Sequence, residues 1–408
     1  MSSSHSLLVG YGWFVGFGAV AAISVWLFAW VLVGRATRGV PTLRAGVDLA
    51  ASNPPNGRVC VIVPAHNEAR VIAALVRSLR AETYGELGVV LALDRCTDDT
   101  AALARAGFAG DARFEIVEID SCPPDWTGKV HALHAGVTRS RGAAAADYLL
   151  FADADTEFEP GCIAATLALM RERKLDLLSL LSTLSYASWF ERVVQPAATL
   201  ELMRQYPLTL ANAATGRRPF ANGQFLLFNR AAYDEIGGHA AIKSSLFDDV
   251  DLARCIDKRS KMAGVFFADG LFHCSMYGEW SQFRRGWKRI FTEAAGRHAR
   301  RLTLSAWRAR WLGTLLPLWM IAAGPVGALL VRTDPVLGWT LIVLWVAGLT
   351  IWLGTLARIA MLSRAPVWTA PLHLIGAWLT ASILDEAASD LRTRTPTRWG
   401  GREYDLGV

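Results

Sequence analysis

The sequence predicts an α/β domain with a mostly parallel sheet, flanked by membrane-spanning helices. Between residues 59 and 151, four short apolar runs alternate with stretches of helical periodicity, and this order produces a parallel sheet with helices on its faces. Uncharged apolar stretches long enough to cross a bilayer lie on both sides of this segment. With 52% hydrophobic residues in a chain of 408, the protein is too apolar for an ordinary cytoplasmic domain.

Residues 7–33 form the first apolar stretch. These 27 residues carry no charge, and as a helix they would extend roughly 40 Å, against about 30 Å for the hydrocarbon core of a bilayer. A signal peptide explains them less well, because no basic residue precedes them and the stretch is too long. Arg35, Arg38 and Arg44 follow directly, so the positive-inside rule places them in the cytoplasm. We expect an N-terminal transmembrane helix over residues 1–34 in the inner cell membrane.

Residues 58–279 are expected to form the cytoplasmic α/β domain. Strands are expected at 59–63, 87–93, 114–119 and 148–151, and helices at 68–80, 98–105 and 129–140. In a parallel sheet the carboxyl ends of the strands meet at one edge, and ligands bind there. The six cysteines form no C-x-x-C pair, which argues against a disulfide framework and against a zinc site.

Polar residues follow the first two strands. The sequence Pro-Ala-His-Asn-Glu stands at residues 64–68, without the G-x-G-x-x-G that a dinucleotide-binding site would use. Asp94 ends the second strand, where its carboxylate can accept hydrogen bonds from a base or a ribose. Thr97 or Asp98 is placed to cap the helix that follows.

Two aspartates, Asp153 and Asp155, follow the fourth strand with one residue between them. Like charges this close repel each other unless a cation or a proton lies between them. A divalent ion such as Mg²⁺ or Mn²⁺ prefers oxygen ligands and can bridge to phosphate oxygens. A solvated turn is the alternative for an isolated D-x-D pair, but the position at a strand end favours a metal site at Asp155 and Asp153.

Residues 280–310 are strongly basic and rich in aromatic side chains. Nine basic residues and one acidic residue give this stretch a net charge of +8. Such a stretch suits an amphipathic helix on anionic lipid headgroups. Retention of positive charge beside a membrane span explains the charges nearest Trp311 equally well. Nucleic-acid binding is less economical, because the cluster ends where an apolar stretch begins. We expect an interfacial region and no nucleic-acid partner.

Residues 311–390 are expected to form a C-terminal membrane region. Two full spans are expected at 311–331 and 336–357. The last apolar stretch, 366–384, contains two prolines and a histidine, and a fourth span would put the basic tail outside, against the positive-inside rule. We therefore expect three spans, a re-entrant or interfacial last segment, and a cytoplasmic tail over residues 391–408.

The order of these motifs resembles the membrane-bound family 2 glycosyltransferases of GT-A fold, which is Rossmann-like with a mostly parallel sheet. The resemblance covers residues 58–290. It is carried by VIVPAHNE at 61–68, Asp94, GKVHAL at 128–133, DAD at 153–155, NGQF at 222–225 and DD at 248–249. The full series is specific, although each piece alone is not.

The resemblance implies a role for each matching position. Four residues would line the uridine or other nucleoside of the donor: Pro64, Asn67, Glu68 and Asp94. Lys129 would lie on the diphosphate side, Asp153 in the ribose or metal shell, and Asp155 on the metal itself. Gly223 and Gln224 match the loop near the donor sugar, and Asp249 falls where the family has its general base.

The residues themselves leave two roles open for Asp249. It begins a helical pattern with Asp248, and an acidic residue in the first turn stabilises a helix by about 0.3 to 1 kcal/mol without doing chemistry. The like charge of Asp248 can instead raise the pKa of Asp249, which helps a base accept a proton from a hydroxyl group.

Processive polysaccharide synthases of this superfamily carry Q-x-x-R-W, and the chain has QFRRGW at residues 282–287. A glycine separates Arg285 from Trp287, so the motif is imperfect. The resemblance implies a diphosphate contact by Arg284 or Arg285 and gating of the acceptor by Trp287, with a surface helix as the alternative. Three or four spans are too few for a polymer channel, which favours a single transfer.

Two further pieces resemble the hopanoid- and carotenoid-associated branch of the family. One runs from GQFLLF at 223–228 to IGGH at 236–239, and the other is the tail RWGGREY at 398–404. The branch has W-K-G-R-x-Y in its tail, where this chain has Gly400 instead of the basic residue.

The resemblance implies an inverting enzyme that moves one sugar from a nucleotide-diphosphate sugar, such as a UDP-sugar, to a hydroxyl of a membrane lipid such as a hopanoid, carotenoid or sphingolipid. Transfer to a polyprenyl phosphate needs no base and is one alternative, and a catalytically silent membrane scaffold is another. His273 is a further metal-ligand candidate, although a lone histidine is more often structural.

Overall fold

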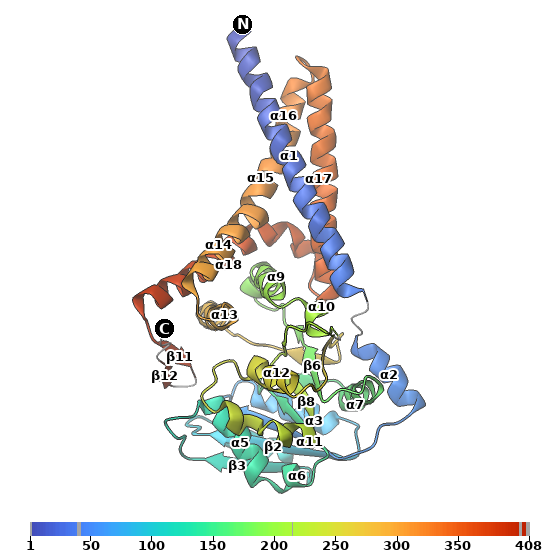
Figure 1. The fold of residues 1–408 in the computed structure, drawn as a ribbon, viewed down its shortest axis with the longest axis vertical. Helices are drawn as coiled ribbons and strands as arrows, with labels where there is room; N and C mark the ends of the chain where they lie inside the picture. Colours follow the sequence, from blue (N-terminus) through green and yellow to red (C-terminus); the bar gives the residue numbers. More distant parts are fainter. Residues whose placement is uncertain (1, 39–41, 214, 400–401, 405–408) are drawn as a thin grey trace.

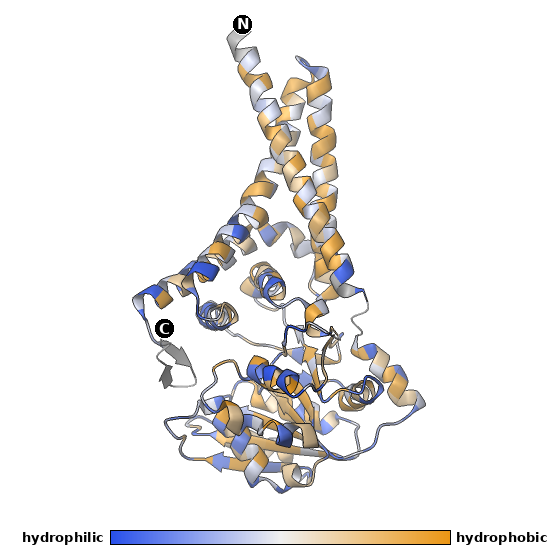
Figure 2. Ribbon diagram, in the orientation of Figure 1, coloured by the Kyte–Doolittle hydropathy of each residue, from blue (hydrophilic) through white to orange (hydrophobic). Residues whose placement is uncertain are grey.

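The computed structural model describes residues 2–38, 42–213, 215–399 and 402–404. An α/β domain lies at one end of the molecule, and a bundle of long helices extends from the other (Figure 1). The bundle contains α1 (Ser2–Thr37), α15 (Leu316–Ile321), α16 (Ala323–Leu330) and α17 (Pro335–Leu362). Hydrophobic residues dominate this bundle, whereas the α/β domain is mixed (Figure 2).

Four helices of the described residues are long and apolar enough to cross a membrane: Ser6–Arg35, Ala299–Leu330, Pro335–Leu362 and Val367–Thr393. In Figure 1, α1, α16 and α17 run side by side, whereas α18 (His373–Thr393) lies across the base of the bundle beside α14 (Ala299–Arg310). The re-entrant or interfacial position expected for residues 366–384 stays a prediction.

Three ion pairs join α18 to α14 and to the helix that precedes α14 in the chain. Asp385 pairs with Arg310 at 2.5 Å, Asp390 pairs with Lys288 at 2.5 Å, and Glu386 pairs with Arg284. Three of the nine basic residues in 280–310 are therefore paired with acidic residues of α18.

The central sheet has seven strands in the order β3-β2-β1-β4-β8-β6-β9. Their bounds are β1 (Val59–Ala65), β2 (Leu87–Asp94), β3 (Phe114–Ile119), β4 (Tyr148–Ala152), β6 (Leu177–Leu181), β8 (Phe225–Asn229) and β9 (Ala263–Phe267). The four expected strands are confirmed as β1 to β4 and are mutually parallel. β8 is antiparallel to both of its neighbours, which the sequence did not predict. A second sheet orders β5 (Thr156–Phe158), β10 (Phe272–Cys274) and β7 (Thr183–Leu184).

Helices cover both faces of the central sheet. Because side chains alternate along a strand, Val61 of β1 faces one core with α3 (Ile72–Ala81) and α7 (Cys162–Glu172), and Ile62 faces the other with α5 (Gly128–Arg139) and α12 (Asp248–Lys258). The three expected helices correspond to α3, α4 (Thr100–Phe108) and α5.

Shorter elements complete the described chain. They are α2 (Leu43–Ser52), α6 (Arg141–Ala144), α8 (Trp189–Val193), α9 (Gln195–Gln205), α10 (Leu208–Ala211), α11 (Arg230–Glu235), η1 (Gly238–Ile242), η2 (Trp311–Leu315), η3 (Val367–Leu372), β11 (Thr397–Trp399) and β12 (Arg402–Tyr404). β11 and β12 form a hairpin in the tail, and Gly400 lies outside the described residues.

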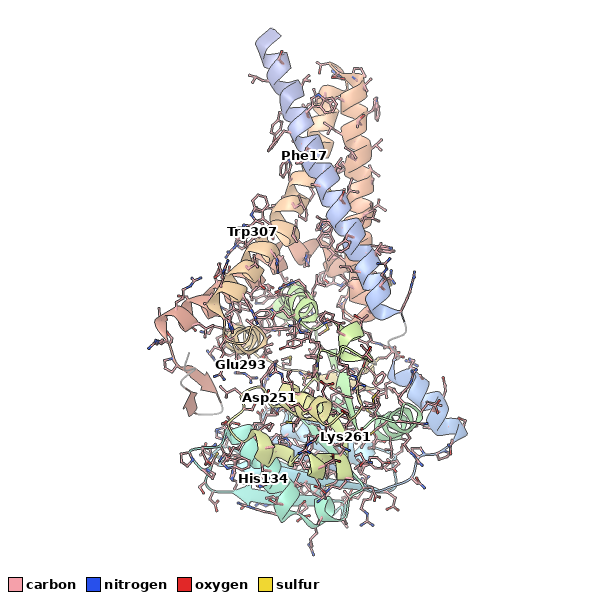
Figure 3. All side chains as sticks on the ribbon, in the orientation of Figure 1. Phe17, His134, Asp251, Lys261, Glu293 and Trp307 are labelled. Atoms are coloured by element: carbon pink, nitrogen blue, oxygen red, sulfur yellow. The ribbon has the colours of Figure 1, made fainter. Side chains whose placement is uncertain are left out.

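The basic segment 280–310 forms two helices with different surroundings. The aromatic face of α13 (Trp280–Ala294) is buried, because Phe283, Trp287 and Phe291 pack with residues of α8, α9 and α18. The sequence suggested that this face lies on the membrane surface. In the structure it is buried against other helices of the protein. Trp307 of α14, in contrast, is 55% exposed (Figure 3). The outer face of α14 is the part of the segment that remains available to a membrane surface.

The burial of α13 predicts a difference between two aromatic residues. Phe291→Ala removes a fully buried ring and should lower the free energy of unfolding by about 3–5 kcal/mol. Trp307→Ala, at an exposed position, should change it by less than about 0.5 kcal/mol. Thermal unfolding in detergent micelles measures both, and equal losses would contradict this packing.

Candidate active site

Residues from separate segments meet at one edge of the central sheet. β1, β2 and β4 are parallel neighbours, so their carboxyl ends lie together. Glu68 follows β1, Asp94 ends β2, and Asp153 and Asp155 follow β4. Because β8 is antiparallel to β4, its amino end reaches the same edge and brings Gly223 there.

Lys129, in the first turn of α5, holds two of the acidic residues. Its Nζ lies 2.7 Å from Asp153 Oδ1 and 3.7 Å from Asp248 Oδ2. Burial by itself would lower the pKa of Lys129, but the charges of Asp153 and Asp248 outweigh it and raise that pKa above its ordinary value. Lys129 is therefore a permanent positive charge at the sheet edge, where it can face a phosphate group.

Asp155 and Glu68 carry negative charge that the protein does not neutralise. Burial, and then the charge of Asp153, raise the pKa of Asp155 to about 6. Burial, and then the charges of Asp155 and Asp153, raise the pKa of Glu68 to about 7. The Cys274 thiol donates a hydrogen bond to Asp155 Oδ1 at 3.6 Å. A weak thiol donor is a poor substitute for a cation.

The charge of this cluster fits a divalent cation, whereas its ligand count is incomplete. Asp153, Asp155 and Glu68 influence one another electrostatically, and a doubly charged ion would relieve their repulsion. Within the described residues, no group of three His, Cys, Asp or Glu side chains is arranged to hold a metal ion. Such a partial shell suits an ion that keeps water and phosphate oxygens as its other ligands.

His273 lies apart from this cluster. It alternates with Cys274 along β10, so the two side chains point to opposite faces. His273 Nε2 lies 3.0 Å from the Gly270 carbonyl and 3.7 Å from Glu159 Oε1. These contacts agree with a structural role. Cys274, which does contact Asp155, was missed because a single cysteine in a strand gives no sequence signal.

Asp249 lies beside Lys129 at the start of α12. Its Oδ2 accepts a hydrogen bond from the Gly223 amide at 2.8 Å, and its Oδ1 accepts one from the Val250 amide at 2.8 Å. Burial, and then the charge of Asp248, raise the pKa of Asp249 to about 7. A carboxylate with such a pKa can exchange protons near neutral pH.

Gly223 allows this close approach. A Cβ atom at this position would lie 3.2 Å from Asp249 Oδ2 and 3.4 Å from Lys129 Nζ. Next to it, Gln224 is buried, and its side-chain oxygen accepts a hydrogen bond from the side-chain amide of Asn222 at 3.1 Å. The loop before β8 is therefore fixed against both charged residues.

The residues expected at the nucleoside largely organise the loops. Asn67 has a left-handed backbone (φ 58°), and its side-chain oxygen accepts a hydrogen bond from the Thr97 amide at 2.8 Å. Asp94 is buried and accepts two hydrogen bonds from Arg95, at 2.8 Å and 2.6 Å. Pro64 continues β1 opposite Ala92. The sequence did not identify Arg95 as the partner of Asp94, because an ion pair between adjacent residues has no characteristic spacing.

The QFRRGW motif of α13 contacts other helices of the protein. Arg284 pairs with Glu386 of α18 and lies over the Trp280 ring. Trp287 is 3% exposed within the apolar cluster. Trp287 is thus covered in the described arrangement, and Arg284 is paired although its side chain is 42% exposed; their contacts with an acceptor and a diphosphate stay predictions. Arg285 is exposed, and its contact with a diphosphate stays a prediction.

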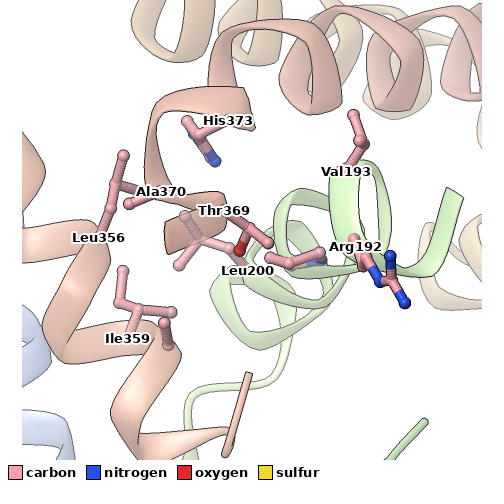
Figure 4. Close-up of a pocket in the computed structure, with 10 residues that line it drawn as sticks. Arg192, Val193, Leu200, Leu356, Ile359, Thr369, Ala370 and His373 are labelled. Atoms are coloured by element: carbon pink, nitrogen blue, oxygen red, sulfur yellow. The ribbon is translucent and has the colours of Figure 1, made fainter. Parts of the chain in front are cut away.

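An apolar pocket lies away from the acidic cluster, between α8–α9 and the base of the helix bundle (Figure 4). Leu200 of α9 faces Leu356 and Ile359 of α17 across it, and Arg192 and His373 are polar residues at its wall. The walls of the pocket are thus formed by α8 and α9 on one side and by the apolar helices on the other.

Comparison with known proteins identifies a family. The family model described as "Glycosyltransferase like family 2" matches residues 54–300. No curated protein sequence matches the chain.

Solved structures to which the chain is similar include the following three. The mannosyltransferase PcManGT from Pyrobaculum calidifontis, in complex with GDP-Man and Mn²⁺, is 18% identical with a TM-score of 0.46, covering 82% of this chain and 97% of its own. Staphylococcus aureus TarS 1–349, in complex with UDP-GlcNAc, is 13% identical with a TM-score of 0.40, covering 85% and 95%. Glucosyl-3-phosphoglycerate synthase from Mycobacterium tuberculosis, with Mn²⁺, UDP and phosphoglyceric acid, is 14% identical with a TM-score of 0.38, covering 62% and 82%.

The tight packing at Gly223 predicts a loss of activity without a loss of fold. In Gly223→Ala the new methyl group should displace the Asp249 carboxylate by a few tenths of an ångström, so turnover should fall, by less than the roughly 100-fold that a misplacement of about 1 Å costs. Gly85→Ala is the matched control, because nothing lies within 4 Å of a Cβ atom there. Turnover and thermal midpoint of both variants check this, and full activity of Gly223→Ala would contradict it.

Proposed function

The chain belongs to the glycosyltransferase-like family 2, and from that premise we propose that it transfers one sugar from a nucleotide-diphosphate sugar to a hydroxyl group of a membrane lipid. One observation carries the proposal. Asp249, whose pKa is near neutral, lies beside Lys129 and the acidic residues at a single sheet edge, in a chain with long apolar helices.

The donor would bind along this edge, and a UDP-sugar is the donor that we propose. Four residues would line its nucleoside: Pro64, Asn67, Glu68 and Asp94. Asp155 and Asp153 would hold a divalent cation, Mg²⁺ or Mn²⁺, which when bound supplies positive charge for the diphosphate. Lys129 would stabilise the negative charge that grows on the departing diphosphate, and Gly223 and Gln224 would face the sugar.

Asp249 would act as the general base. The acceptor oxygen forms a bond to the anomeric carbon, the bond from that carbon to the diphosphate oxygen breaks, and the hydroxyl proton moves to Asp249. Attack from the side opposite the leaving group inverts the configuration at the anomeric carbon. The raised pKa of Asp249 matches a base that works near neutral pH.

The helices support a lipid as the acceptor. Four helices long and apolar enough to cross a membrane flank the α/β domain, so an acceptor that lies in a bilayer would be close to the site. Hopanoids, carotenoids and sphingolipids all combine an apolar body with a hydroxyl group. Arg35 at the end of α1 and the exposed basic residues of α14 support an inner-membrane protein with a cytoplasmic catalytic domain.

A polyprenyl phosphate is the second candidate acceptor. Both carboxylate oxygens of Asp249 accept backbone hydrogen bonds, which is also what a purely structural residue at a helix start would do. A phosphate acceptor is already ionised, so its transfer needs no base. The two acceptors therefore differ in their demand on Asp249.

Two substitutions separate the roles at the site. Asp249→Asn should lower turnover by about 10²- to 10⁴-fold with donor binding retained, because it removes the base. Asp155→Ala should abolish turnover and also weaken donor binding. Asp257→Asn, on the same helix as Asp249, is the control. Turnover and donor titration by calorimetry measure both effects, and normal turnover in Asp249→Asn would favour the phosphate acceptor.

The pH dependence of turnover gives an independent check. Because the pKa of Asp249 is raised to about 7, a growing fraction is protonated below that pH and cannot accept a proton. At saturating donor and cation, kcat should fall about tenfold per pH unit below pH 7 and level off above it. A profile that is flat from pH 5.5 to 8.5 would rule out Asp249 as the base.

A further inference from the structure

A buried histidine lies behind the catalytic helix and has no role in the mechanism above. His239, in η1, is 0% exposed. Its Nδ1 lies 2.7 Å from the Tyr233 hydroxyl, and the same hydroxyl oxygen accepts a hydrogen bond from the His239 backbone amide at 3.1 Å. The Tyr233 hydroxyl can then donate its own proton to Nδ1, and in that tautomer a neutral His239 carries its proton on Nε2.

The ring of His239 is held neutral. Burial lowers the pKa of His239 to about 3, although the charge of Asp248 opposes this effect. The charged and titratable groups that act on the ring are Asp248 of α12, Lys129 and His134 of α5, and Tyr233 of α11. Nε2–H is thus a donor at every pH at which the protein works.

A buried donor and a buried acceptor lack hydrogen-bond partners in this region. Among the described residues, His239 Nε2 and Asp248 Oδ2 are both fully buried without a hydrogen bond. The Asp248 carboxylate has only the longer contact with Lys129, 3.7 Å from Nζ. Buried polar groups are almost always paired, and these two are complementary.

Packing alone does not explain a histidine at this position. Its ring stands edge-on to Phe151 with centroids 4.6 Å apart, and it also contacts the Tyr233 ring. A phenylalanine would match these ring contacts, and only the Tyr233 hydroxyl would lose a partner, its bond to Nδ1. Gly238 has φ +52°, and a Cβ atom there would lie 2.6 Å from the Tyr233 ring. The Gly-Gly-His sequence thus brings His239 beneath Tyr233.

We propose that His239 is a positioning residue whose Nε2–H binds Asp248 Oδ2, directly or through one buried water, and so fixes the carboxylate between Lys129 and Asp249. This inference rests on the proposed function, because Lys129 and Asp249 are the groups that it orients. A carboxylate fixed in this way keeps its charge, holds Lys129 toward the diphosphate, and maintains the raised pKa of Asp249.

The test compares His239→Phe, which keeps the packing, with His239→Gln, which keeps a donor. We expect His239→Phe to lower kcat about tenfold and to move the acidic limb of its pH profile to lower pH, since an Asp248 carboxylate that is no longer held beside Asp249 repels it less. His239→Gln should retain most of the wild-type rate and limb. In an Asp248→Asn background, His239→Phe should have no further effect. An unchanged limb in His239→Phe, or the same loss in both backgrounds, would overturn the proposal.

A spectroscopic measurement keeps the test independent of catalysis and of the folding of His239→Phe. In protein labelled with ¹⁵N-histidine, the signal of His239 among the eight histidines is identified by its absence in His239→Gln, and it should remain neutral at pH 5 with its proton on Nε2. Its Nε2–H resonance should shift in Asp248→Asn. No such shift would refute the contact with Asp248, whether or not the protein transfers a sugar, whereas a shift in a protein without transferase activity would refute the proposed function alone.

Discussion

An excess of negative charge at one sheet edge is the constraint on which the rest of the structure depends. Glu68, Asp153 and Asp155 face one another there, and Asp248 and Asp249 face Lys129. The raised pKa values of Glu68, Asp155 and Asp249 mean that folding disfavours their charged forms, so the cluster reduces stability at neutral pH. The two cores of the sheet must offset this cost, and any cation or phosphate-bearing ligand that balances the charge would stabilise the fold.

The direction of each strand decides which residues reach that edge. The four parallel strands could be predicted from the sequence, because apolar runs alternating with helices have one usual arrangement. From them followed the convergence of Glu68, Asp94 and Asp155. The reversed β8 could not be predicted, since a single apolar run is the same in either direction. Yet only an antiparallel β8 puts Gly223, at its amino end, against Asp249.

The contacts that tune the site were beyond prediction from the sequence. Cys274 reaches Asp155 through the pairing of β10 with β5, and His239 approaches Asp248 through the packing of η1 against α12. Cys274 and Asp155 are far apart in sequence, and His239 and Asp248 belong to different elements. Neither pair has a periodicity or a spacing that the sequence could reveal. The motifs located the charged residues, whereas the partners that shift their pKa values are set by tertiary packing.

The partner of α13 was misjudged for a related reason. An amphipathic pattern shows that Phe283, Trp287 and Phe291 share a face, but a bilayer and a neighbouring helix satisfy that face equally well. Here α18 covers it and adds the ion pairs to Arg284 and Lys288. Tyr277 packs against Phe283 of the same face, and Gly286 leaves room for its hydroxyl. Burial raises the pKa of Tyr277, and the charge of Asp155 raises it further.

Contacts thus connect α18 to α13 and α13 to Tyr277, and two residues before Tyr277 the Ser275 amide donates a hydrogen bond to the Asp155 carbonyl at 3.0 Å. A path of packed side chains and ion pairs fixes the acidic cluster at one distance from the apolar helices, which a flexible linker would not do. An acceptor held in a bilayer presents its hydroxyl at a nearly constant depth. For the lipid acceptor that we propose, reaction would require the base and the donor at that same depth to within about 1 Å, and the attachment of α13 to α18 would meet this requirement.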